Sequence, residues 1–262
     1  MANFLPLKRY ILFCIDKLID KYNLIPPFLD VGCGNAYASV HVAGRGWHGK
    51  AIDISAQAIE VSRQTLFGYA NIQLEKKSLF EEQGSYNTLL LLDILEHLPD
   101  ERQVLEKACA LLSSGGYLLL SLPSNPREWR WDDEFYGHYR RYTPSHINEL
   151  LNASGFTPLI MWDISYPVFW LMRRCYLRFN PVQRINPDKY ASTLASSCHN
   201  AYVLSSPVKT LAKATKLWNI VYRLQFACCR NFLNRGYELI ILAQKTEIST
   251  LLAKAGAGSV KN

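Results

Sequence analysis

Two short stretches near the N-terminus combine glycine with acidic residues in an order that suits a small-molecule ligand. Residues 30–34 (DVGCG) follow a short apolar run that begins at Phe28, and a helix is predicted directly after them, over residues 36–44. Glycines let the backbone approach a ligand closely, and the first turn of a helix offers N–H groups without partners. Asp53 ends the next predicted strand, about 20 residues further on, where a carboxylate would accept hydrogen bonds from ribose hydroxyls.

The charges of this loop indicate which ligand it suits. A nicotinamide dinucleotide fingerprint needs a third glycine, and the position is taken here by Ala36 or Tyr37. Asp30, directly before the glycines, would repel a pyrophosphate. S-adenosylmethionine has no phosphate and carries an ammonium and a sulfonium group. The loop therefore favours S-adenosylmethionine as cofactor and disfavours a nucleotide-dependent dehydrogenase.

The loop after the fifth predicted strand holds the candidates for the acceptor side. Methyl transfer is an in-line displacement that needs an aligned acceptor and a group that takes its proton. His138 is one candidate base, since imidazole titrates near neutral pH, and His97 is a second. Arg140 and Arg141, followed by Tyr142, are candidate substrate contacts, with the arginines clamping an anionic acceptor. A surface histidine and a solvated arginine pair are the alternatives.

The elements that must position these residues alternate between strand and helix. This pattern predicts an α/β fold, a Rossmann-like, doubly wound and mostly parallel sheet of seven strands. A helix over residues 5–22 precedes the sheet. The predicted strands are 28–34, 49–54, 71–75, 87–92, 117–122, 156–162 and 237–244, and the helices between them are 36–44, 56–67 (capped by Ser55), 100–112 and 144–155.

Four segments in this order resemble the successive motifs of class I S-adenosylmethionine-dependent methyltransferases. They are FLDVGCGNA (28–36), AIDIS (51–55), LLLLDILEHLPD (89–100) and LLSSGGYLLLSLP (111–123), and the resemblance covers about residues 28–163. It implies that Asp30, Gly32 and Gly34 line the methionine end of the cofactor, that Asp53 binds both ribose hydroxyls, that Ser78 and Leu79 flank the adenine, and that Asp93 lies beside the sulfonium. Ser78 departs from the family, which usually has an acidic residue there to hold the adenine amino group.

The resemblance also bears on the acceptor. Residues 137–156 are similar to bacterial members that methylate lipids, quinone precursors or lipid-linked glycans. Members that methylate the amines of nucleic-acid bases carry an Asn or Asp-Pro-Pro-aromatic tetrapeptide after the fourth strand. This chain has residues 93–96 (DILE) there, which argues against that chemistry.

Composition limits the other possibilities. The 262 residues are 49% hydrophobic and 19% charged, which excludes a disordered chain. No uncharged apolar run is long enough to span a membrane, and the charged N-terminal stretch does not fit a signal peptide. The seven cysteines include no C-x-x-C pair, so we expect neither a disulfide framework nor a zinc cluster, no metal ligands, and a reducing cytosolic location.

Positive charge is concentrated in one segment. The net charge is +7, yet residues 166–236 hold eleven Lys or Arg and a single acid, Asp188. We therefore divide the chain into an N-terminal helix (1–27), a methyltransferase core (28–165), a basic, aromatic and helical insertion (166–236), a final core strand (237–245) and a flexible tail (246–262). The family's terminal antiparallel hairpin would be split by this insertion.

The insertion is predicted to contain one long helix over residues 207–234. One stripe of this helix is basic, and the far side is largely aromatic and apolar. The basic residues are Lys209, Lys213, Lys216, Arg223 and Arg230, and the far side carries Trp218, Tyr222, Cys229 and Leu233. This pattern is typical of a helix lying on an anionic membrane. Packing on the sheet with a solvated basic face, and binding of an RNA backbone, are the alternatives.

Together these features predict an S-adenosylmethionine-dependent methyltransferase. Its acceptor would be a hydrophobic, lipid or lipid-linked molecule, methylated on oxygen at the cytosolic face of a membrane, with residues 166–236 in peripheral contact with the lipid. The alternative functions are an RNA methyltransferase and a catalytically silent, cofactor-binding partner subunit.

Overall fold

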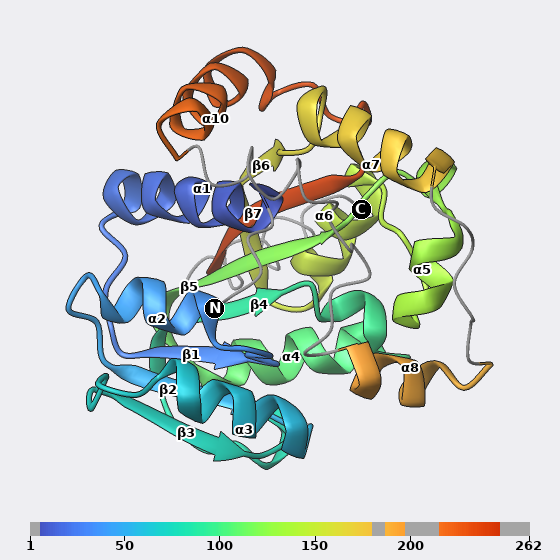
Figure 1. The fold of residues 1–262 in the computed structure, drawn as a ribbon. Coiled ribbons are helices and arrows are strands. Elements are labelled where there is room, and N and C mark those ends of the chain that lie inside the picture. The colour runs from blue at the N-terminus through green and yellow to red at the C-terminus, as the bar shows by residue number, and fades with distance from the viewer. Residues whose placement is uncertain (1–5, 180–186, 197–214, 247–262) are drawn as a thin grey trace, which may run out of the picture.

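The fold is built on one twisted sheet (Figure 1). The computed structural model describes residues 6–179, 187–196 and 215–246. Within them the strand order is β3-β2-β1-β4-β5-β7-β6, and β7 runs antiparallel to both of its neighbours. The strands are β1 (Phe28–Val31), β2 (Gly49–Asp53), β3 (Ile72–Lys76), β4 (Tyr86–Leu92), β5 (Leu112–Pro123), β6 (Phe156–Asp163) and β7 (Glu238–Lys245). The predicted Rossmann-like, mostly parallel sheet of seven strands is confirmed.

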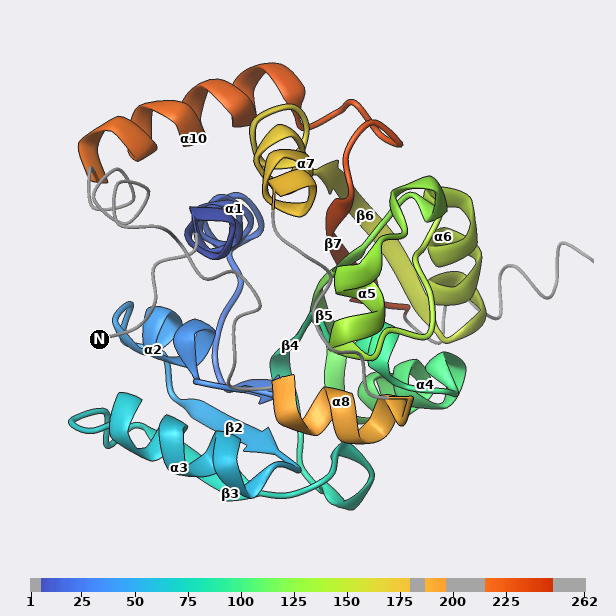
Figure 2. The same ribbon diagram turned by 45° about the vertical axis from the view of Figure 1, so that its right-hand side comes forward.

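Helices cover both faces of this sheet (Figure 2). They are α1 (Pro6–Tyr22), α2 (Tyr37–Ala43), α3 (Ala56–Thr65), α4 (Glu101–Leu111), α5 (Trp131–Tyr136), α6 (Pro144–Ala153), α7 (Val168–Phe179), α8 (Lys189–Ser196) and α10 (Thr215–Cys229). One buried apolar cluster joins the sheet to α1, α2, α7 and α10, and a second joins it to α4 and α6. The central strands are buried on both faces, which explains the continuous apolar run of β4.

Local signals set where several helices begin. The Ser55 hydroxyl accepts a hydrogen bond from the Ala58 N–H at the start of α3, as predicted, and Thr143 caps α6 in the same way ahead of Pro144. Two strand boundaries differ from the sequence prediction by three residues or more. Strand β1 ends at Val31, three residues before the predicted end, where the glycine loop begins. Strand β5 begins at Leu112, five residues early, because Leu112 pairs with Tyr86 before the register shifts and the main pairing resumes.

The predicted insertion lies between β6 and β7 and carries α7, α8 and α10. These two strands pair with each other along their length, so the terminal antiparallel hairpin is complete in spite of the insertion. The predicted helix over residues 207–234 is described only as α10, which ends at Cys229. The beginning of that predicted helix, with Lys209 and Lys213, lies outside the described residues, as do residues 247–262 of the predicted tail.

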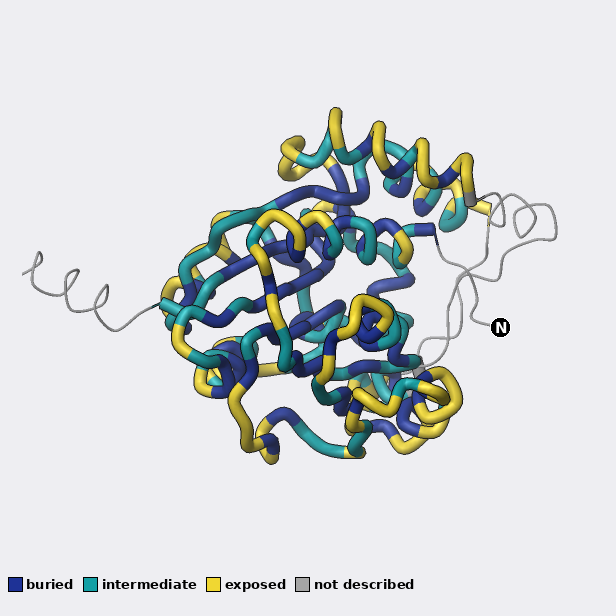
Figure 3. The backbone as a smooth tube through the Cα atoms, turned by 90° about the vertical axis from the view of Figure 1, so that its left-hand side faces the viewer, coloured by how far each residue is buried: buried dark blue, intermediate teal, exposed yellow. Residues whose placement is uncertain are grey.

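Helix α10 packs on α1 and also contacts the sheet, where the Phe226 ring lies 4.9 Å from the ring of Trp162 in β6. Trp218 and Tyr222 are buried, and the Tyr222 hydroxyl donates a 3.0 Å hydrogen bond to the Pro6 carbonyl. The Tyr10 ring lies 5.3 Å from the rings of both Tyr222 and Phe169. The opposite side of α10 is exposed (Figure 3). The N-terminal helix and the insertion therefore share one aromatic core.

A buried carboxylate joins the two ends of the insertion. The Asp163 side chain, at the end of β6, accepts hydrogen bonds from the backbone N–H groups of Ser165 (3.1 Å), Tyr166 (3.3 Å) and Gly236 (2.7 Å). Gly236 fits this contact because a Cβ there would lie 2.2 Å from the Asp163 carboxylate. Asp163 thus fixes where the chain leaves the sheet and where it returns.

We predict that Asp163→Ala lowers the free energy of unfolding by roughly 2–4 kcal/mol, because it leaves three N–H groups without their acceptor in a buried site. Urea unfolding measures this loss. Asp20→Ala, which removes an exposed carboxylate of α1 paired with Arg45, is the control and should change stability by less than about 1 kcal/mol. Equal stability of the two variants would contradict the role of Asp163.

Candidate active site

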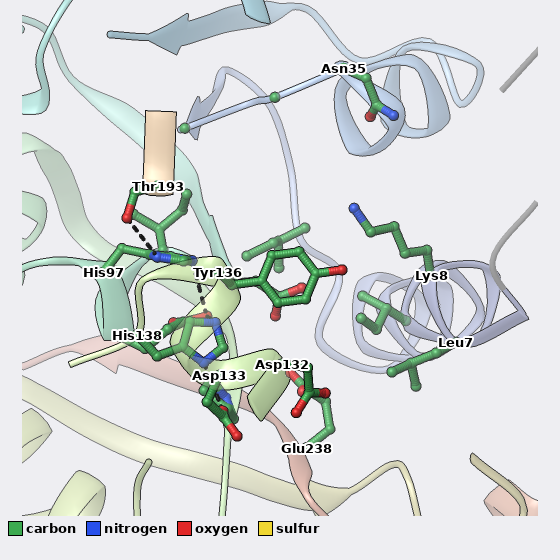
Figure 4. A pocket seen from close by; sticks show the side chains of 18 of the residues that line it. Leu7, Lys8, Asn35, His97, Asp132, Asp133, Tyr136, His138, Thr193 and Glu238 are labelled. Carbon is green, nitrogen blue, oxygen red and sulfur yellow. Dashed lines mark hydrogen bonds and ion pairs between the residues drawn. The ribbon is translucent and has the colours of Figure 1, made fainter. Parts of the chain in front are cut away.

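A cavity of about 760 Å³ opens at the carboxyl ends of β1, β2 and β4. Strand order reverses between β1 and β4, and ligands of open α/β sheets bind at such a point. The loops after these strands form one wall, and α1, α5, α7 and α8 contribute the rest. In Figure 4, His97, His138 and Asp133 lie on one side, and Leu7 and Lys8 of α1 face them.

The glycine loop after β1 lines one end of this cavity. Gly32 and Gly34 have positive φ angles of 66° and 56°. A Cβ on Gly32 would lie 2.2 Å from the side chain of Ile94, in the turn that follows β4. The positive φ and this close contact both favour glycine at position 32. The Gly34 N–H donates a 2.9 Å hydrogen bond to Asp53. The loop thus holds its backbone open toward the cavity, as the spacing of glycines indicated.

Asp30 does not line the cavity, and this corrects the expectation for that residue. Its side chain is buried behind the loop and accepts a 2.6 Å hydrogen bond from the Ser39 hydroxyl of α2. Burial, reinforced by the charge of Asp53, raises the pKa of Asp30 to about 7 against the effect of that hydrogen bond. Asp30 therefore supports the loop from behind.

Asp53 ends β2 and faces the cavity. Its two oxygens accept hydrogen bonds from the backbone N–H groups of Ser55 (2.8 Å) and Gly34 (2.9 Å). Burial raises the pKa of Asp53, although these hydrogen bonds oppose the shift. Each carboxylate oxygen has a second lone pair, so Asp53 can still accept hydrogen bonds from a ligand.

Ser78 and Leu79 line the cavity next to Asp53. The Ser78 hydroxyl accepts a hydrogen bond from the Phe80 N–H and caps the short helix η1 (Leu79–Glu81). Ile54 and Phe80 are 41% and 46% exposed at the same place. Sequence reasoning missed these two apolar side chains, although Ile54 directly follows the acidic residue that it identified.

Asp93 follows β4 with a φ of 56°, an unusual angle for a residue with a side chain. The Ser121 hydroxyl donates a 2.7 Å hydrogen bond to its carboxylate. Glu238, at the start of β7, lines the same part of the cavity, and its pKa is raised well above the usual range by burial and by the charge of Asp93. Sequence reasoning missed Glu238. The sequence feature that could have identified it is an acidic residue at the start of a strand whose next five residues are apolar.

Two histidines meet at the other end of the cavity. His97 ends the short helix η2 (Leu95–His97), and His138 follows α5 after Gly137, so that their ring centroids lie 4.8 Å apart. His138 Nδ1 lies 2.9 Å from an Asp133 oxygen, and His97 Nδ1 lies 3.2 Å from the Thr193 hydroxyl. Burial, with the neighbouring His138, holds the pKa of His97 well below its usual range.

Asp133 connects His138 to two arginines. Arg141 and Arg173 approach its oxygens to 2.7 Å and 3.1 Å. Burial by itself would raise the pKa of Asp133, but the hydrogen bond with His138 and the charge of Arg141 outweigh it, and the pKa lies well below the usual range. Asp133 is therefore a carboxylate that can fix the orientation of the His138 ring.

Of the three predicted substrate contacts, only Arg141 lines the cavity. Arg141 is held by Asp133 and by the carbonyls of Ser124 and Tyr237, at 3.0 Å each. Arg140 instead pairs with Glu101 at 2.6 Å, and the buried Tyr142 hydroxyl donates to Glu101 at 2.9 Å. Successive residues of this extended segment alternate in direction, so the two arginines do not form the expected clamp.

The fold and the cavity define a class I methyltransferase, and comparisons with known proteins agree. The methyltransferase-domain family matches residues 7–159, and the chain belongs to this family. The resemblance to class I S-adenosylmethionine-dependent methyltransferases is thereby confirmed, and with it the expected cofactor.

Curated relatives include the ubiquinone biosynthesis O-methyltransferases of Nitrosomonas europaea and Xanthomonas euvesicatoria pv. vesicatoria. The first is 32% identical over 108 residues, which cover 38% of this chain and 46% of the relative. The second is 33% identical over 98 residues, which cover 36% and 41%. The similarity thus spans less than half the length of these relatives.

Solved structures of methyltransferases share the fold. Magnesium protoporphyrin IX methyltransferase from Synechocystis PCC 6803 with bound S-adenosylhomocysteine has a TM-score of 0.54 at 15% identity, over 92% of this chain and 84% of that chain. The 1,6-didemethyltoxoflavin-N1-methyltransferase of Burkholderia thailandensis also has a TM-score of 0.54 at 15% identity, over 94% and 80%.

We predict that Asp53→Ala weakens S-adenosylmethionine binding by at least about 100-fold, because it removes a charged acceptor for ribose hydroxyls and an anchor of the Gly34 N–H. Calorimetric titration measures the affinity, and circular dichroism checks that the fold is kept. Glu60→Ala, on the exposed side of α3, is the matched control. Unchanged affinity of the Asp53 variant would refute the ribose assignment.

Proposed function

We propose that this protein transfers a methyl group from S-adenosylmethionine to an oxygen atom of a hydrophobic acceptor, a lipid or a lipid-linked molecule. The observation that carries this proposal is the continuity of one cavity from the glycine loop and Asp53, past Asp93, to His97 and His138. The names of the curated relatives, which are O-methyltransferases of ubiquinone biosynthesis, support oxygen as the methylated atom.

In this proposal the cofactor occupies the part of the cavity formed by the strand ends. The methionine end lies along Gly32 and Gly34, and the ribose hydroxyls donate to Asp53. The adenine lies beside Ser78 and Leu79, with the exposed ring of Phe80 as an apolar neighbour. Asp93 lies beside the sulfonium, where a carboxylate favours positive charge.

The acceptor oxygen then attacks the methyl carbon, the bond between carbon and sulfur breaks, and S-adenosylhomocysteine leaves. The acceptor proton passes to His138 Nε2. Asp133 supports this role, because it accepts the Nδ1 proton at 2.9 Å and leaves the Nε2 lone pair toward the cavity. His97 lies beside it as the second candidate.

The chemical character of the acceptor side favours an apolar molecule. Its wall is formed by Leu7 and Ile11 of α1 and by Phe169, Met172 and Phe179 of α7. Phe179 is 81% exposed at the rim of the cavity, so an acceptor with an apolar tail would find a continuous surface there. The basic composition of α7 suggests that Arg173 could bind an anionic group of the acceptor. Arg173 is instead paired with Asp132 at 2.6 Å.

We also propose that α10 contacts an anionic membrane. Leu217, Ile220 and Leu224 are exposed on it, together with Lys216 and Arg223. Aliphatic side chains among basic ones suit a lipid interface, whereas an RNA-binding face would need exposed aromatic rings for base stacking. None of the described helices has the length and apolar character that crossing a bilayer requires.

Not all of the positive charge of the insertion is available for such a contact. Arg173 and Arg174 of α7 are paired with Asp132 and Glu128, two acids of the core. The total of basic residues over 166–236 therefore overstates the basic surface, and the membrane proposal depends on α10.

We expect the protein, incubated with methyl-labelled S-adenosylmethionine and a cell extract, to place label in the organic phase after solvent partition. His138→Ala should lower this turnover by at least about 100-fold with cofactor affinity unchanged, since it removes the proton acceptor. His146→Ala, which removes an exposed histidine of α6 outside the cavity, is the control. Label confined to aqueous RNA would favour the RNA alternative, and no label from the protein on its own would favour a silent partner subunit.

We predict that a Lys216→Glu, Arg223→Glu double variant binds vesicles containing phosphatidylglycerol at least about 30-fold more weakly, because each basic residue contributes about 1 kcal/mol near an anionic surface. Sedimentation with vesicles measures the binding. An Arg63→Glu, Arg102→Glu double variant has the same charge change at exposed side chains of α3 and α4 and should bind normally. Equal binding by both double variants would refute the docking role of α10.

A further inference from the structure

Three side chains with metal-binding atoms meet at the wall of the cavity, between η2 and the end of α5. One Glu96 carboxylate oxygen lies 3.8 Å from His97 Nε2 and 3.9 Å from His138 Nε2. The three donor atoms all lie within 4.8 Å of one another. These separations exceed hydrogen-bond length, so the two Nε2 atoms and the carboxylate face a shared point without bonding to each other.

We propose that Glu96, His97 and His138 bind one divalent transition-metal ion, with zinc as the favoured metal. Two imidazoles and one carboxylate form a ligand set that suits zinc or iron(II) and leaves coordination positions open. An ion between the three atoms would lie about 2.5 Å from each, and an inward shift of about 0.4 Å by each side chain would give the usual zinc–nitrogen bond of about 2.1 Å.

The surroundings hold the donors in the orientation that metal binding needs. Metal-binding histidines usually bond through their second ring nitrogen to a carboxylate or another polar group. Here Asp133 bonds to His138 Nδ1 at 2.9 Å, and the Thr193 hydroxyl bonds to His97 Nδ1 at 3.2 Å, so both Nε2 atoms stay directed at Glu96. The second Glu96 oxygen is buried without a hydrogen-bond partner among the described residues, in a side chain that is 1% exposed.

The catalytic role of the ion rests on the proposed function, whereas the existence of the metal site does not depend on it. The three donors line the acceptor end of the cavity, so the open positions of the ion would face the acceptor hydroxyl. A bound divalent ion lowers the pKa of a coordinated hydroxyl. In the metal-loaded protein His138 would be a ligand and no longer the proton acceptor. The acceptor hydroxyl, with its pKa lowered by the ion, would release its proton to a water molecule before its oxygen attacks the methyl carbon.

This site differs from the sequence expectation of no metal ligands. That expectation rested on cysteine spacing, whereas these donors come from residues 96–97 and 138. Packing of α5 and α8 against η2 brings them together, with Thr193 supplied by the insertion.

The test is calorimetric titration of zinc into the full chain after treatment with chelator, with cobalt(II) absorption as a second readout of the ligand set. We expect one ion per chain, and affinity at least about 100-fold lower in Glu96→Gln, His97→Gln and His138→Gln. Thr193→Val should weaken binding by about 10-fold, as loss of a supporting contact does. His48→Gln, an exposed histidine outside the cavity, is the matched control, and thermal unfolding checks each variant.

Two results would overturn the inference. One is the absence of saturable zinc binding by the folded protein. The other is binding that all three ligand variants retain, as expected for an ion held by exposed Cys228 and neighbouring Cys229. Cofactor affinity, measured on the same metal-free protein, tests the proposed function separately. A chain that binds S-adenosylmethionine but shows no saturable zinc binding refutes the metal site, and a chain that binds zinc but methylates no lipid-phase acceptor refutes the proposed function.

Discussion

The buried carboxylate of Asp133 is the contact on which the acceptor side of the cavity depends. It bonds at once to His138, Arg141 and Arg173, which belong to the loop after α5, the segment before α6 and the insertion helix α7. Removing one member of such a buried group leaves charge uncompensated, at a cost of about 3–5 kcal/mol. The orientation of His138 is therefore coupled to the seating of α7 on the core.

The insertion has two roles, one in forming the cavity and one in forming an exposed surface. Its amino-acid composition does not show which of its helices has which role. The inner side of α7 directs Arg173 at Asp132 and Asp133 and lends apolar side chains to the cavity. The outer side of α10 exposes aliphatic and basic residues, while Trp218 and Tyr222 anchor it to α1. Because α1 also lines the cavity, the helix that anchors the surface proposed to meet lipid also forms a wall of the space proposed to hold the acceptor.

The two ends of the cavity are constructed differently. At the cofactor end, the shape of the cavity is set mainly by the backbone. Gly32 and Gly34 adopt positive φ angles, and the Gly34 N–H donates a hydrogen bond that joins their loop to Asp53. At the acceptor end, side chains from η2, α5, α7 and β7 meet, and Asp132, Asp133, Arg141 and Arg173 form one network of ion pairs. The first construction suits a constant ligand, and the second allows the acceptor to vary within one fold.

The sequence by itself determined the sheet, the glycine loop and Asp53, because each depends on residues that are neighbours along the chain: apolar runs, helix caps and glycines at fixed spacing. It also identified His97 and His138 as candidate bases, and both line the cavity. It did not determine that Asp30 supports the loop from behind, that Arg140 points away to Glu101, or that Glu238 joins Asp93. Nor did it reveal that Glu96, His97 and His138 face one point, or that Arg173 is neutralised by the core. Those outcomes depend on which way side chains turn when distant segments pack, and only the tertiary structure decides that.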